Sequence, residues 1–161
     1  MATDSPFPHS ARLDLDGPDL VDVAYCFDHW FDGDPSDRTA DAVLAALVVR
    51  HHGLEVVLLG SGPAALLPDT VEPPIGTVAL ALGVGGWQAP SDTDTPRAHR
   101  PSRHPQRRRV FVTTVVGGPD ASTVTVLRVA GTDEPTLVRT ATSGRVPDAL
   151  VRCWMNLRRA S

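Results

Sequence analysis

Two neighbouring segments of this sequence alternate between β-branched and other side chains and are joined by a turn sequence. They are residues 109–116 (RVFVTTVV) and 122–129 (STVTVLRV), with GGPDA lying between them. Val, Thr and Phe favour a pleated, half-buried backbone, whereas Gly, Pro and Asp favour tight turns. The pattern predicts a β-hairpin, in which the two strands are antiparallel.

Three further segments have the composition of strands. Residues 54–60 (LEVVLLG) and 76–87 (GTVALALGVGGW) are apolar runs bounded by Gly and Pro, and residues 136–142 (TLVRTAT) are rich in β-branched side chains. Short apolar runs between such breakers indicate buried strands. The first two segments therefore extend the predicted sheet, and the third is a candidate fifth strand.

Helical periodicity is found towards the two ends of the chain. Residues 17–33 place apolar side chains on one helical stripe, and residues 34–53 (DPSDRTADAVLAALVVRHHG) do the same, with Gly53 as a left-handed stop. Residues 147–159 form a third such segment. The expected stripes are Leu20, Val23, Ala24, Phe27, Trp30 and Phe31; Ala40, Val43, Leu44, Leu47, Val48 and His51; and Leu150, Cys153, Trp154 and Leu157.

Helices at the ends with consecutive strands between them predict an α+β domain. We expect a largely antiparallel sheet of four to five strands, an N-terminal helical pair and a C-terminal helix. A length of 161 residues suits a single domain with a substantial core. Residues 1–11 are expected to be a disordered tail, and residues 88–107, rich in Pro and Arg, a long mobile loop.

The sequence contains neither a signal peptide nor an apolar run near the ~18 residues of a membrane span. Its two cysteines, Cys26 and Cys153, do not make a disulfide framework. These features predict a cytoplasmic protein without a membrane partner.

The charged residues are segregated along the chain. Residues 1–96 hold 15 acids and 3 arginines, whereas residues 97–161 hold 4 acids and 12 arginines, within a formal net charge of −4. The absence of lysine is typical of a GC-rich bacterial genome, and it excludes Schiff-base chemistry through a lysine amine. Such segregation indicates either a basic interaction surface or a chain that neutralises itself.

The basic residues are densest between Thr95 and Pro119, where there are six arginines and no acid. Exposed like charges repel within a Debye length of roughly 8 Å, so this cluster is expected to meet an anion. The candidate partners are the acidic half of this chain or of a second copy, an acidic protein surface or small anion, and nucleic acid. Nucleic acid is less favoured, because single-strand binders interleave aromatic rings with charge and Trp87 and Phe111 only flank the cluster. The predicted contact residues are Arg97, Arg100, Arg103, His104, Arg107, Arg108 and Arg109.

Three motifs with catalytic or ligand-binding spacing have simpler explanations. Residues 60–65 match a dinucleotide fingerprint, but the prolines that follow leave barely one turn of helix for a pyrophosphate. Cys153 and Arg159 have the spacing of a phosphatase loop but lie inside an amphipathic helix without glycine. A zinc site drawn from Cys26, His29, His51 and His52 lacks four ligands that could converge. We therefore identify no catalytic residue, and we predict neither a metal nor a cofactor.

The segregated charge favours a small binding or regulatory domain that acts through a protein partner or self-assembly, with the arginine-rich loop as the contact. One alternative is an enzyme in which residues 88–107 close as a lid over a small anionic substrate held by Arg100, Arg103 and His104. Another is a nucleic-acid-binding protein.

Overall fold

The computed structural model describes residues 17–31, 42–89, 103–132, 134–138 and 145–160. Within these ranges the chain forms two α-helices, two short 3-10 helices and six strands. In chain order they are α1 (Gly17–Trp30), β1 (Ala42–Arg50), β2 (Gly53–Ser61), η1 (Gly62–Leu66), η2 (Pro68–Thr70), β3 (Thr77–Gln88), β4 (Arg108–Gly117), β5 (Ser122–Val129), β6 (Thr136–Val138) and α2 (Arg145–Ala160).

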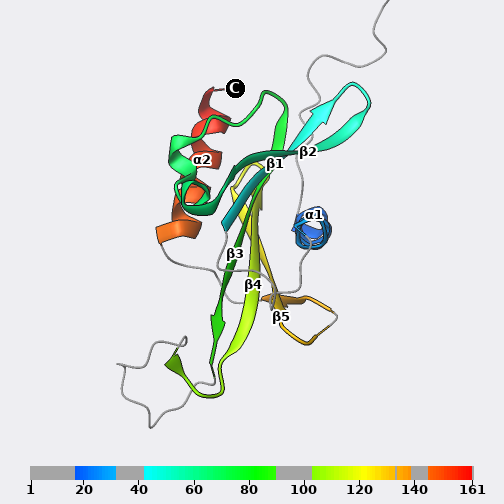
Figure 1. The fold of residues 1–161 in the computed structure, drawn as a ribbon. Helices are drawn as coiled ribbons and strands as arrows, with labels where there is room; N and C mark the ends of the chain where they lie inside the picture. Colours follow the sequence, from blue (N-terminus) through cyan, green and yellow to red (C-terminus); the bar gives the residue numbers. More distant parts are fainter. Residues whose placement is uncertain (1–16, 32–41, 90–102, 133, 139–144, 161) are drawn as a thin grey trace, which may run out of the picture.

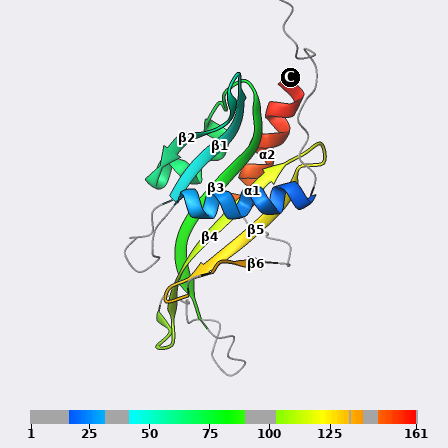
Figure 2. The same ribbon diagram turned by 90° about the vertical axis from the view of Figure 1, so that its right-hand side faces the viewer.

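The six strands form one antiparallel sheet in the order β2-β1-β3-β4-β5-β6. The two α-helices lie on opposite faces of this sheet, α1 across β4 and β5 and α2 behind β3 and β4 (Figures 1 and 2). Each face of the central strands is therefore covered, which is why these strands are apolar on both sides.

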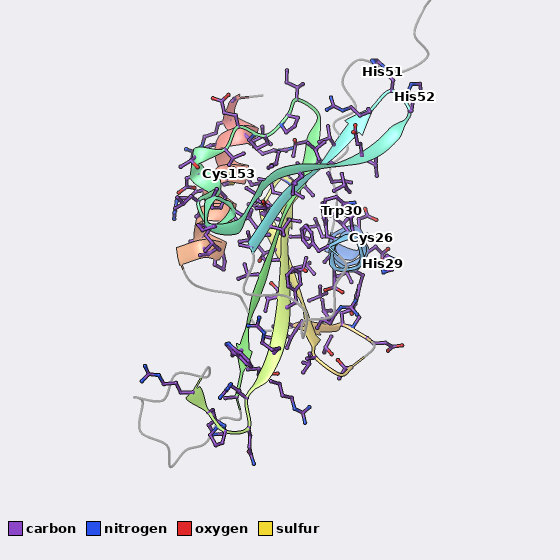
Figure 3. All side chains as sticks on the ribbon, in the orientation of Figure 1. Cys26, His29, Trp30, His51, His52 and Cys153 are labelled. Atoms are coloured by element: carbon purple, nitrogen blue, oxygen red, sulfur yellow. The ribbon has the colours of Figure 1, made fainter. Side chains whose placement is uncertain are left out.

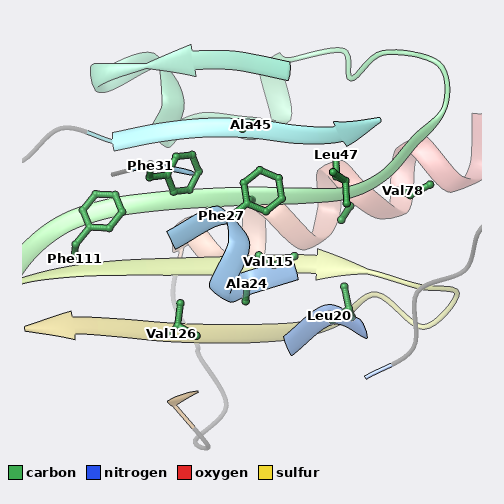
Figure 4. Close-up of a cluster of buried hydrophobic side chains, with 12 residues drawn as sticks. Leu20, Ala24, Phe27, Phe31, Ala45, Leu47, Val78, Phe111, Val115 and Val126 are labelled. Atoms are coloured by element: carbon green, nitrogen blue, oxygen red, sulfur yellow. The ribbon is translucent and has the colours of Figure 1, made fainter. Parts of the chain in front are cut away.

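The core on the α1 side is built from one stripe of the helix and the side chains beneath it (Figure 4). Leu20, Ala24, Phe27 and Phe31 are buried against β1, β3, β4 and β5, and the Phe31 and Phe111 rings meet edge to face at 6.1 Å between centroids. Gly83 lies below both rings, where a Cβ atom would come within 2.5 Å of Phe111 Cζ. The close approach of α1 to β3 thus requires a residue without a side chain here.

The core on the α2 side centres on Leu150, Cys153 and Trp154, which are buried in one cluster with residues of β1, β3 and β4. Trp154 Nε1–H donates a hydrogen bond of 2.9 Å to the Gly118 carbonyl, which satisfies the one polar atom of this ring. The predicted α2 stripe is confirmed, with Leu157 partly buried at its edge.

The α+β class and the antiparallel sheet are confirmed, but two details of the prediction are wrong. In the described part of the chain the sheet has six strands, and residues 42–50 of the predicted second N-terminal helix form β1 instead. Gly53, the predicted helix stop, opens β2 with a φ of +128°.

The reason is that β1 lies inside the sheet with both faces covered, and all residues from Ala42 to Val48 except Val43 are buried. Such a strand shows a continuous apolar run, and a continuous run also satisfies a helical stripe. Within the predicted α1 stripe, Trp30 is exposed, and Asp28 is buried in its place.

The β3–β4 hairpin extends beyond its neighbours. The first residue of β1, Ala42, pairs with Val84, and the last residue of β5, Val129, pairs with Val110. Trp87 and Gln88 of β3 therefore pair only with Arg109 and Arg108 of β4, and this end projects as a two-stranded ribbon (Figure 1). No described helix is long and apolar enough to cross a membrane.

Candidate partner-binding site

The projecting end of the hairpin carries most of the predicted contact residues that the structure describes. We call it the arm, and it comprises residues 87–88 of β3 and residues 103–109, which include a turn and the start of β4. Arg103, Arg107 and Arg108 are exposed, and His104 and Arg109 are partly buried. Arg97 and Arg100 lie outside the described residues, as do residues 1–11, 139–142 and most of the predicted loop.

Trp87 is the organising residue of the arm. The guanidinium carbons of Arg107 and Arg109 lie 5.0 and 4.7 Å from the centroid of its ring. Trp87 is directly opposite Arg109 in the hairpin register, and side chains two positions apart on a strand share a face, which brings Arg107 to the same ring. These distances are those of cation–π contacts, which hold a guanidinium in place. Arg107 Nη1 also donates a hydrogen bond of 3.5 Å to the His104 carbonyl.

The turn before β4 is fixed by His104. Its carbonyl accepts a hydrogen bond from the Arg107 backbone N–H at 3.2 Å, and its Nδ1 accepts one from the Gln106 backbone N–H at 3.0 Å. The turn therefore positions Arg107 through backbone as well as side-chain contacts.

Among the described residues, no carboxylate lies within 4 Å of the guanidinium groups of Arg103, Arg107 or Arg108. The ion pairs that the structure records join other arginines to acids: Arg50 with Glu55, Arg128 with Asp28, and Arg152 with Asp69. All three of these pairs involve residues outside the arm.

Sequence reasoning missed Trp87 as a member of the cluster. It lies 20 positions before Arg107 in the chain, and the register of β3 against β4 brings the two side chains together. A long connection between two strands does not fix their register, so only the alternating apolar positions of both strands could have suggested this pairing.

The structure places the other motifs away from the arm (Figure 3). Cys26 and His29 lie on α1, and His51 and His52 lie at the tip of the β1–β2 hairpin. In the ranges that the structure describes, no three His, Cys, Asp or Glu side chains gather closely enough to hold a metal ion. Gly60 and Gly62 lead into a 3-10 helix of five residues, whose Ala65 packs against Gly60.

Cys153 is a buried core residue of α2. Its Sγ lies 3.9 Å from the Val71 carbonyl, and burial, with a smaller effect of the Asp69 carboxylate, raises the pKa of the thiol. A raised pKa disfavours the thiolate that a phosphatase nucleophile requires.

In comparisons with known proteins, no family model matched this chain, and no curated protein and no solved structure matched it.

Proposed function

We propose that this chain is a small binding domain whose arm contacts an acidic protein surface, on another protein or on a second copy. The observation that carries the proposal is the placement of Arg107 and Arg109 over Trp87 at the projecting end of β3 and β4. Guanidinium groups bind carboxylates through two parallel hydrogen bonds, and holding them on a ring reduces the entropy that binding costs.

The projection of the arm supports a macromolecular partner. Among the described residues no strand pairs with the hairpin beyond Ala42 and Val129, although the Ala130 N–H donates a hydrogen bond of 2.9 Å to the Arg109 carbonyl. Arg107 and Arg108 are exposed, so a partner surface can approach both faces. Arg107 and Arg109 lie on one face, and Arg108, opposite Gln88, lies on the other.

The test is binding of a fluorescently labelled polyglutamate peptide at low ionic strength. We expect the Arg107→Gln/Arg109→Gln variant to bind at least about tenfold more weakly, since two charge-assisted contacts are lost. The control variant Arg158→Gln/Arg159→Gln changes the net charge equally at the far end of α2. Equal binding by wild type and both variants, or equal weakening in both variants, contradicts the proposal.

Trp87 also favours a second candidate, single-stranded nucleic acid. An aromatic ring beside arginines is a common platform for bases, and Trp87 is 37% exposed. A labelled oligothymidylate in the same assay separates the two. Base stacking predicts that Trp87→Leu weakens binding of the oligonucleotide more than that of polyglutamate, whereas an acidic protein partner predicts tighter binding of polyglutamate.

A further inference from the structure

The two edges of the sheet differ in length. One edge strand, β6, spans the three residues Thr136–Val138. The other, β2, spans nine residues from Gly53 to Ser61 and, within the described part of the chain, pairs with β1 alone. The outer side of an edge strand presents backbone N–H and C=O groups that can pair with another extended chain. β2 is thus the long pairing edge of this sheet.

One face of β2 carries an apolar row that is exposed. Leu54 and Leu58 are 56% and 55% exposed, and Val56 lies half-buried between them. The register places these three residues opposite Val49, Ala45 and Leu47 of β1, and Ala45 and Leu47 belong to the core on the α1 side. The row therefore continues the α1-side core to the edge of the sheet, where α1 does not reach (Figure 2).

The other face of β2 is closed by η1. Ala65 is buried, and its backbone lies 3.8 Å from the position that a Gly60 Cβ atom would take. β2 is thereby held with one covered face and one open face. Its pairing with β1 is regular from Gly53 to Leu58, and the register shifts between Leu58 and Gly60.

Bulges, charges and prolines usually protect an edge strand, but the register shift of β2 lies beyond Leu58 and leaves Gly53 to Leu58 without a bulge. Its sequence, GLEVVLLGS, contains no proline and one charged residue. That residue, Glu55, forms an ion pair of 3.1 Å with Arg50 on the face opposite the apolar row. Edge strands that remain unpaired are commonly protected by inward-pointing charges, prolines or shortness, so this strand is suited to pairing.

We propose that β2 pairs antiparallel with β2 of a second copy of this chain, about a two-fold axis perpendicular to the sheet. A two-fold pairing of this kind keeps Leu54, Val56 and Leu58 of both copies on one face, where they meet as cross-strand neighbours. The start of one β2 then lies beside the end of the other, so the two Glu55 carboxylates are not directly opposed. The β2 strand of a second copy has the same length and places its apolar residues at matching positions. It also brings no two like charges directly opposite each other.

This interface is independent of the arm, because the arm is formed by β3 and β4 and the interface by β2. The dimer is held by apolar contacts and backbone hydrogen bonds. Salt weakens contacts between exposed charges, so we expect it to have little effect on this dimer. A dimer presents two arms, which strengthens binding to a partner with repeated acidic sites.

The test is sedimentation velocity across a range of protein concentrations, in low and in high salt. We expect wild type to sediment at twice the monomer mass in both, and Leu58→Lys and Leu54→Lys to sediment as monomers. The matched control is Ile75→Lys, which makes the same change at a residue that is 95% exposed in the segment before β3, and it stays dimeric. Circular dichroism establishes that each variant is folded. We expect both leucine variants to fold, because both leucines are exposed in the monomer.

Hydrogen exchange provides the second measurement. Pairing protects alternate β2 amides in wild type and in Ile75→Lys, and this protection is lost in Leu58→Lys. A wild-type monomer at every concentration overturns the proposal, as does a dimer that persists in both leucine variants or one that Ile75→Lys also dissolves. Loss of association in high salt alone assigns self-assembly to the arm and overturns the β2 interface, whereas polyglutamate binding by Leu58→Lys keeps the arm proposal intact.

Discussion

Asp28 is a charged residue at the centre of an apolar interface. Its side chain is fully buried between α1 and the sheet, and its Oδ2 accepts hydrogen bonds from Nε and Nη2 of Arg128 on β5. Its Oδ1 is buried without a partner among the described atoms, as is Thr113 Oγ1. Removing water from a carboxylate is costly, so the Asp28 charge is tolerable because a guanidinium meets it.

Removing Arg128 should therefore destabilise the fold strongly. We expect Arg128→Ala to lower the free energy of unfolding by about 3–5 kcal/mol, because it strands a buried carboxylate. Replacing both partners with apolar residues, as in Asp28→Leu/Arg128→Met, should recover much of this loss. Urea unfolding measures both values. Arg152→Ala, which breaks the exposed pair with Asp69, is the control and should change stability by no more than about 1 kcal/mol. Equal effects of Arg128→Ala and Arg152→Ala would contradict the account.

The two cysteines should differ sharply in reactivity. Cys26 is exposed on α1, whereas Cys153 is buried with a raised pKa, so a thiol reagent should modify Cys26 rapidly and Cys153 only after unfolding. Ellman's reagent measures this directly, with Cys26→Ser leaving a single slow thiol. Rapid modification of Cys153 in the folded protein would be inconsistent with its place in the core.

The raised pKa of Cys153 also makes stability depend on pH. The unfolded thiol loses its proton at a lower pH than the folded one, so the stabilisation is complete at neutral pH and is lost as pH rises above 9.0, the ordinary value. Urea unfolding at neutral and alkaline pH should show a smaller loss in Cys153→Ala than in wild type.

At the scale of elements, the packing of α1 on β3 depends on the missing side chain at Gly83. A Cβ atom there would lie 2.5 Å from Phe111 Cζ and 2.9 Å from Phe31 Cδ2, which forces both rings to shift. We expect Gly83→Ala to destabilise the protein by about 1–3 kcal/mol, as overpacked cores do. Gly86→Ala on the same strand is the control, because its Cβ would meet only Val110 Cγ2 at 3.7 Å. It should be neutral or stabilising in the same urea titration.

The sequence predicted those elements that carry a local signal. β4 and β5 are rich in β-branched residues and are joined by a short turn sequence, although β4 is mostly buried, and α1 and α2 each carry one apolar stripe. β1 was mistaken for a helix because it is buried on both faces and its apolar run is unbroken. Asp28 could not be placed on the buried face of α1, since the residue that neutralises it, Arg128, is 100 positions away.

In the candidate site, too, the sequence predicted the local features and missed the contacts between distant residues. The clustering of arginines is visible in the sequence because it is local, and it identified Arg103, Arg107, Arg108 and Arg109. The contact of two of them with Trp87 depends on a hairpin register that the long connection leaves open. Likewise, the apolar row on β2 could be recognised as an edge only once the strand order was known.

At the scale of the whole molecule, exposed positive charge is concentrated on the arm. The formal net charge is −4, yet the arm projects from the sheet with at least three exposed guanidinium groups. Potentials near a surface follow local charge within a Debye length of roughly 8 Å, and the total has little effect over that range. An anionic surface that approaches the arm should therefore be attracted by its local positive potential, although the net charge of the protein is negative.

This concentration of charge predicts that the protein binds a sulfonate cation exchanger at neutral pH in low salt, although its net charge is negative. We expect Arg107→Gln/Arg109→Gln to flow through the column, because the loss falls on the arm. Arg158→Gln/Arg159→Gln lowers the net charge by the same amount elsewhere and should still be retained. If net charge governed adsorption, wild type would flow through with both variants. If diffuse positive charge governed it, the two variants would elute together. Only an arm that acts as a local cationic site makes the two variants elute differently. Each guanidinium removed from the contact lowers the salt concentration needed for elution.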